Sequence, residues 1–249
     1  MKYDLSPLEL LKLLGFDQPV GREALKTFQE EAGIPLPKLY REFLELAMDC
    51  PLLGTGDLWC GQMIPIRMRP CLLYAPVEQA RQAGLPNYLE IGSDYCTGML
   101  TFGIRLEDLD QEDPQVWQNH DFEPRYTWRL ANQCLTDFLM EVLMGALALV
   151  NYDTAEEALE ARGWTYADYT MEYLEAHAEE EDDDEDGSSV DEQALLAKGI
   201  DPEQVRWREC PYGGRLFCCA DIEKGVLYAG RWDAGEENTL YTITRTDNA

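Results

Sequence analysis

The sequence is poor in histidine and in basic residues, and both shortages exclude classes of function. Only 2 histidines and 20 lysine and arginine residues accompany 48 aspartate and glutamate residues, and the net charge is −28 over 249 residues. A chain this acidic repels phosphate backbones and anionic membranes, so we expect neither direct nucleic-acid binding nor membrane binding. A partner with a basic surface is the natural expectation.

Cysteine pairs with metal-binding spacing are also missing. The 8 cysteines include no C-x-x-C pair, and the adjacent Cys218 and Cys219 would point to opposite faces of a strand. With so few histidines, the sequence predicts no structural zinc site. The start, Met1–Asp4, leads into an amphipathic segment without the basic head and apolar run of a secretory leader. We therefore expect a cytoplasmic protein with reduced thiols.

Long apolar runs are absent as well. The longest, Val142–Val150, has nine residues, whereas a membrane-spanning helix needs about 20. The composition nevertheless includes 45% hydrophobic and 10% aromatic residues, which is enough for a sizeable core. The length suggests one large domain or two small ones.

Apolar periodicity and turn residues predict an α+β protein. The leucines at positions 5, 8, 11 and 14 predict a short first helix that starts at Ser6-Pro7. The other expected helices of the first part are Arg22–Glu31, a helix that begins at Pro37, and Cys134–Val150. The expected strands between them are Met63–Met68, Tyr88–Ile91, Met99–Ile104, Val116–Trp117 and Thr127–Leu130. A main α+β domain is thus expected over residues 1–150.

The sequence of residues 151–249 predicts three further segments. Residues 151–178 are expected to be a helical connector, with a capping box at Thr154 and a second helix that begins at Thr165. Residues 179–190 form an acidic flexible linker, and residues 191–249 a β-rich extension. That extension is expected to hold a short helix and a small four-stranded meander, which either stands beside the main domain or extends its sheet. The meander strands are Val205–Cys210, Arg215–Ala220, Gly225–Arg231 and Thr239–Arg245.

The acidity is concentrated late in the sequence. Residues 1–150 hold 22 acids and 12 bases, whereas residues 151–249 hold 26 acids and 8 bases. Eight consecutive carboxylates, Glu179–Asp186, account for much of this excess. Such a run is either a solubilising linker or a contact for a basic partner, and the sequence leaves both interpretations open.

No set of residues assembles an active site. His120-Asp121 with Cys96 as nucleophile is the one hydrolase hypothesis, but adjacent residues rarely orient each other. Gly92-Ser93-Asp94 lacks the second glycine of a nucleophile elbow. We therefore expect a protein that is not an enzyme and that needs neither a cofactor nor a metal.

Several segments in one order resemble the SUKH superfamily. The segment Gly33–Leu44 is similar to the family's G-x-x-L-P-x-x-[Y/L]-x-x-F-L helix start, and Leu89–Asp94 resembles its strand followed by G-S-D. Val116–Asp121 is similar to its V-[YW]-x-x-[HD]-[DE] strand, and Thr136–Leu139 to its closing helix segment. After Asp94 the family's glycine-rich turn is reduced to a single glycine. The resemblance covers roughly residues 20–148.

The resemblance implies helices packed on a mixed, curved β-sheet and a role as an immunity protein. Such a protein binds and neutralises a bacterial toxin domain of a polymorphic toxin system, here expected to be a basic nuclease, by electrostatically complementary occlusion. The residues expected to contact the partner are Asp57, Asp94, Tyr95, Asp121, Glu123, Glu179, Glu180, Glu181, Asp182, Asp183, Asp184, Glu185 and Asp186. The alternative is an intracellular adaptor or regulatory module whose partner is not a toxin, since one fold can serve several functions.

Overall fold

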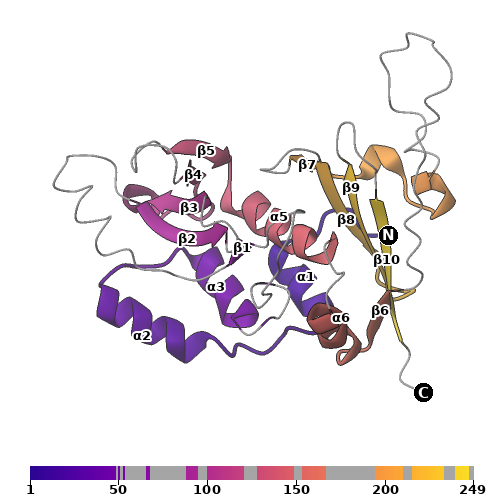
Figure 1. The fold of residues 1–249 in the computed structure, drawn as a ribbon, viewed down its shortest axis with the longest axis horizontal. Helices are drawn as coiled ribbons and strands as arrows, with labels where there is room; N and C mark the ends of the chain where they lie inside the picture. The colour runs from indigo at the N-terminus through magenta and orange to yellow at the C-terminus, as the bar shows by residue number, and fades with distance from the viewer. Residues whose placement is uncertain are drawn as a thin grey trace, which may run out of the picture. The chain divides into compact units, whose positions relative to one another are not determined.

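The computed structural model divides the chain into two compact units (Figure 1). The N-terminal unit is Ser6–Ala158, and the C-terminal unit combines Met1–Leu5 with Leu159–Ala249. The N-terminal unit is therefore an insertion between two pieces of the other one. The residues that the structure describes are 1–48, 50, 53, 66–67, 88–94, 100–120, 128–148, 153–166, 194–209, 215–232 and 239–246. The predicted boundaries of the linker and the β-rich extension stay predictions, since residues 167–193 lie outside this description.

The predicted helices of the N-terminal unit are present. They are α1 (Pro7–Leu13), α2 (Arg22–Ala32), α3 (Lys38–Ala47), α5 (Leu135–Ala148) and α6 (Asp153–Glu160), of which α6 runs across the unit boundary. A 3-10 turn, η2 (Leu106–Asp108), follows the third strand.

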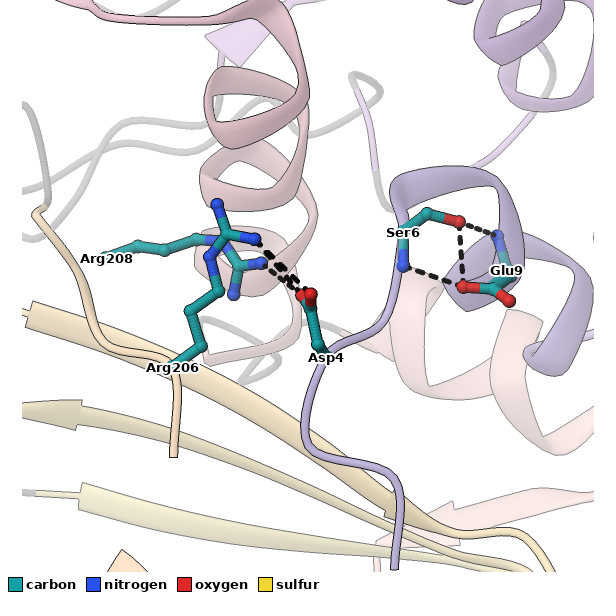
Figure 2. A network of polar contacts seen from close by, with 5 residues as sticks. All are labelled: Asp4, Ser6, Glu9, Arg206 and Arg208. Atoms are coloured by element: carbon teal, nitrogen blue, oxygen red, sulfur yellow. Dashed lines mark hydrogen bonds and ion pairs between the residues drawn. The ribbon is translucent and has the colours of Figure 1, made fainter. Parts of the chain in front are cut away.

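Local sequence explains where these helices begin and end. Ser6 caps α1, because its hydroxyl accepts from the Glu9 backbone while the Glu9 carboxylate accepts from the Ser6 backbone (Figure 2). Gly33 ends α2 with φ = 63°, a left-handed conformation that favours glycine. Helix α6 begins at Asp153, one residue before the Thr154 that the capping-box motif singled out.

The described residues of the N-terminal unit form one five-stranded sheet. Its strands are β1 (Ile66–Arg67), β2 (Tyr88–Asp94), β3 (Leu100–Arg105), β4 (Val116–His120) and β5 (Arg129–Asn132), and they lie in this order. The α+β class is confirmed. A mixed sheet was expected, but every described pairing is antiparallel, because neighbours in sequence pair directly and a parallel pair would need a crossover.

Helices α3 and α5 lie against one face of this sheet (Figure 1). The Tyr40 hydroxyl of α3 donates to the Ile91 carbonyl of β2 at 2.7 Å. Phe138 of α5 packs on Phe102 of β3 with ring centroids 5.0 Å apart, and both side chains are fully buried. This face is the core side of the first sheet.

The C-terminal unit contains a second five-stranded sheet, separate from the first. Its strands are β6 (Trp164–Tyr166), β7 (Arg208–Glu209), β8 (Arg215–Asp221), β9 (Val226–Trp232) and β10 (Thr239–Arg245), in the order β6-β10-β9-β8-β7. The predicted four-stranded meander is confirmed, and it forms its own sheet instead of extending the first.

One helix prediction is wrong. A helix was expected to begin at Thr165, but Trp164–Tyr166 forms β6, which pairs antiparallel with β10. Tryptophan, threonine and tyrosine all favour strands, and pairing with β10 gives their backbone groups partners that a short helix would not. The remainder of that expected helix lies outside the described residues.

One face of the second sheet carries its own hydrophobic core. Residues 194–197 are helical, Gly199 follows with φ = 74°, and the 3-10 turn η3 (Pro202–Gln204) leads towards β7. The buried core residues are Leu195, Ile200, Val205, Phe217, Cys219, Tyr228 and Leu240, with Tyr3, Trp207 and Val226 packed against them. Within the described chain, no helix has the length and apolar character that a membrane crossing needs.

Candidate protein-binding face

The structure describes only one of the residues that are predicted to contact the partner. Asp94 is the last residue of β2, where it pairs with Ile66 of β1. The other predicted residues lie outside the described part of the chain: Asp57, Tyr95, Asp121, Glu123 and the acid run Glu179–Asp186. Cys96 of the hydrolase hypothesis also lies outside it, while His120 ends β4.

Sheet topology nevertheless relates two of the predicted positions. Strands β2 and β4 both flank β3 and run antiparallel to it, so the two strands end at the same end of the sheet. Their last residues, Asp94 and His120, are therefore about 10 Å apart across one intervening strand.

A second feature lies on the sheet face opposite α5. Adjacent residues of a strand point to opposite faces, so Gly103 and Arg105 lie on the face that Phe102 does not. Tyr88 pairs with Arg105, and Trp117 pairs with Gly103, which places them on this same face. We call Tyr88, Arg105, Trp117 and Trp128 the aromatic–arginine cluster.

The four side chains of the cluster contact one another. Tyr88 stacks on Trp128 with ring centroids 4.1 Å apart and an interplanar angle of 13°, and it meets Trp117 edge-on at 6.3 Å. The Arg105 guanidinium carbon lies 3.9 Å from the Trp117 ring centroid, a cation–π geometry. Arg105 also approaches Glu107 at 3.8 Å. Aromatic and charged groups thus fix each other in position.

Gly103 makes room for Trp128. A Cβ atom on Gly103 would lie 2.9 Å from Cη2 of Trp128 and 3.0 Å from the Leu89 carbonyl oxygen. Trp128 precedes β5 in the sequence, and its ring lies over Gly103 of β3 and reaches Tyr88 of β2. Any larger residue at position 103 would displace this ring.

The cluster is partly accessible and contains donors without acceptors. Trp117 and Trp128 are half-buried, the Arg105 side chain is 31% exposed, and Leu130, which pairs with Trp117, is 38% exposed. Among the residues that the structure describes, Trp117 Nε1 and Arg105 Nε are buried and have no hydrogen-bond partner. Tryptophan, tyrosine and arginine are the residues that most often dominate protein–protein binding energy. This arrangement can bind a polypeptide surface.

Sequence reasoning missed this cluster. Val116-Trp117 was recognised only as a strand, and the position of Trp128 depends on the register of β5 against β4, which no local pattern reveals. Alternation within β3 and β4 could have placed Arg105 and Trp117 on one face, but only with the strand pairing known.

The thiols of Cys134, Cys218 and Cys219 have raised pKa values. Burial raises the pKa of the Cys134 thiol to about 11 and that of Cys219 to about 12, and it also raises the pKa of Cys218. Because the thiolate is the nucleophile, thiols with raised pKa values are unreactive at neutral pH. Among the residues that the structure describes, no group of three or more histidine, cysteine and acidic side chains could hold a metal ion.

Comparison with known proteins identifies the class of the inserted domain. Residues 19–141 match a family model, and the segment belongs to the SUKH superfamily. The family is SMI1/KNR4 (SUKH-1), whose members are known as toxin-immunity proteins and are generally not enzymes. The match includes all five strands of the first sheet and the whole aromatic–arginine cluster. No curated protein and no solved structure matches this chain.

Proposed function

We propose that this protein is a non-enzymatic immunity protein that binds and neutralises a toxin domain in the cytoplasm. The SUKH-1 match over residues 19–141 carries the proposal. The partner is expected to be a basic nuclease, because the net charge of −28 favours a basic partner and disfavours nucleic acid itself. Occlusion of the nuclease's phosphate-binding surface would block its activity.

Two parts of the N-terminal unit support a division of tasks within this proposal. The acidic residues at and after the ends of β2 and β4, Asp94 and Asp121 among them, would speed association through long-range attraction. The aromatic–arginine cluster would hold the complex together at short range, since buried aromatic and arginine contacts govern dissociation. The acid run Glu179–Asp186 adds attraction only if the linker interpretation is wrong.

Co-expression with the product of the neighbouring gene tests the proposed function. We expect growth rescue by the immunity protein, a co-purified complex, and an association rate that falls steeply as salt rises. If the experiment shows no growth rescue and no complex, the proposal is overturned.

Matched variants test the two contact regions. Trp117→Ala should raise the dissociation rate by tenfold or more, on the order of a hot-spot loss above about 1.4 kcal/mol. Asp94→Asn should mainly slow association at low salt. Asp17→Asn, an exposed acid on the loop between α1 and α2, is the matched control that should change neither rate.

Replacing Glu179–Asp186 by serine and glycine separates the contact and linker interpretations of the acid run. A contact role predicts slower association at low salt and a smaller effect at physiological salt. Unchanged association at both salt concentrations would identify the run as a linker.

An adaptor function is the second candidate, and the C-terminal unit favours it, because the whole of this unit lies outside the family match. An adaptor that has a second folded unit can use this unit to bind a partner that is not a toxin. A neighbouring gene that encodes a toxin domain would favour immunity over this alternative.

A further inference from the structure

The first residues of the chain take part in the sheet of the C-terminal unit. The Lys2 backbone N–H donates to the Ala220 carbonyl at 2.7 Å, and the Ala220 N–H donates to the Lys2 carbonyl at 2.9 Å. This antiparallel bridge lies on β8. The start of the chain therefore satisfies backbone groups of a strand more than 200 residues away in sequence.

The next residue is fixed by its side chain. The Tyr3 hydroxyl accepts a hydrogen bond from the Asp201 backbone N–H at 2.9 Å, next to the start of η3. The Tyr3 ring packs against the core cluster of the C-terminal unit. Tyrosine is suited to this position because its ring contributes apolar area while its hydroxyl meets a backbone donor.

Asp4 lies between two arginines (Figure 2). Its carboxylate accepts from Arg206 Nη1 at 3.3 Å and from Arg208 Nη2 at 3.4 Å. The Arg208 side chain is only 3% exposed, whereas Asp4 is 66% exposed. A buried guanidinium needs a nearby negative charge, so Asp4 contributes most through Arg208, while the pair with exposed Arg206 contributes little.

We propose that the C-terminal unit contains a recognition site for an extended segment in which tyrosine is followed by aspartate, and that residues 2–4 occupy this site in cis. Three kinds of contact define the site: the backbone of β8 at Ala220, the Asp201 N–H for the tyrosine hydroxyl, and Arg208 for the carboxylate. This inference is independent of the proposed toxin binding, because it concerns the other unit and no external partner.

The exchange rate of the Ala220 amide hydrogen reports whether residues 2–4 occupy the site, because this N–H donates to the Lys2 carbonyl. In the full chain, Asp4→Asn should raise the Ala220 exchange rate by about tenfold, as expected for the loss of a charge-assisted hydrogen bond. Asp17→Asn removes an exposed carboxylate of the N-terminal unit and should leave this rate unchanged.

Moving the segment tests recognition separately from chain connectivity. One variant lacks residues 2–4; a second also carries Met-Lys-Tyr-Asp-Leu behind Ala249 on a flexible glycine–serine linker of about 20 residues, which gives a millimolar effective concentration. Deletion should raise Ala220 exchange further than Asp4→Asn, and the appended segment should restore protection, whereas the same segment with Asn for Asp should not.

Either of two results would overturn the proposal. The first is an Ala220 exchange rate that neither the deletion nor Asp4→Asn changes. The second is equal restoration by the Asp and Asn segments, which would mean that no carboxylate is recognised. The Met48 amide of the N-terminal unit, which donates to the Leu44 carbonyl, reports whether each variant remains folded there.

Discussion

The two sheets of this protein have the same size and the same antiparallel pairing, yet strand β4 of the first and strand β8 of the second are buried differently. Along β4, the buried Val116 is followed by the half-buried Trp117 on the opposite face. Along β8, every residue from Leu216 to Asp221 is buried, including the adjacent Cys218 and Cys219. The first sheet therefore leaves one face partly accessible to a partner, whereas both faces of β8 are withdrawn from solvent.

This difference shows how similar topologies serve different purposes. An alternating strand can display aromatic and charged groups on its accessible face, as β3 and β4 display Arg105 and Trp117. A continuously buried strand has no such freedom, and its continuous apolar run contributes to stability instead. This difference agrees with our proposals of partner contact on the first sheet and of recognition of residues 2–4 on the second.

The largest expected effects come from truncating one core phenylalanine in each unit. Phe102→Ala in the first sheet and Phe217→Ala in the second should each lose about 3–5 kcal/mol of unfolding free energy, because both side chains are fully buried. Urea unfolding, monitored by site-resolved hydrogen exchange, measures the loss of unfolding free energy in each unit. We expect each loss to be confined to its own unit; equal destabilisation of both units by either variant would contradict the two-unit comparison.

Gly103→Ala tests the packing beneath the aromatic–arginine cluster. The added methyl would clash with Trp128 and the Leu89 carbonyl, so we expect a loss of about 1–3 kcal/mol from overpacking. In a double-mutant cycle with Trp128→Ala, the penalty at position 103 should become smaller. Strict additivity in thermal or urea unfolding would show that Trp128 does not lie against Gly103.

Removal of the α1 cap should have a smaller effect and should concern the N-terminal unit. Ser6→Ala deletes the hydroxyl that accepts from the Glu9 N–H, which typically costs about 1 kcal/mol. Ser6→Thr keeps the capping hydroxyl, which also donates to the Glu9 carboxylate, and should remain close to the original stability. Urea unfolding of both variants measures the difference, and equal losses would exclude capping as the cause.

The smallest effect is expected at the turn between β8 and β9. Lys224 Nζ lies 3.0 Å from Asp221 Oδ2, and the hydrogen bond from this side chain lowers the pKa of Asp221 below 3.8. A carboxyl with a lowered folded-state pKa stabilises the fold above its unfolded pKa, and this stabilisation disappears as pH falls through the folded value. Lys224→Met should therefore make the second sheet lose structure at a higher pH during acid titration.

The control for this acid titration is Lys26→Met, an exposed lysine of α2. This variant removes the same charge from the other unit and should leave the acid transition of the second sheet unchanged. An identical shift in both variants would indicate an effect of net charge and not of the Asp221–Lys224 pair.

Much of the fold could be predicted because its signals are local. The serine and glutamate of the α1 capping box, Gly33 after α2 and the apolar stripe of α5 each depend on residues within a few positions. Thr165 shows the limit of such signals, since a helix was predicted to begin there but its backbone pairs with β10. The strand partner lies almost 80 residues away, beyond the reach of any local pattern.

The candidate site divides in the same way. The sequence by itself determined the acidity, the α+β class and the order of motifs that resembles SUKH, because each depends on composition or on short spacings. Only the tertiary structure brought Tyr88, Arg105, Trp117 and Trp128 onto one face and placed Asp4 beside Arg208. Strand register and long-range pairing decide which distant side chains meet, and they are properties of the packed chain, not of its local segments.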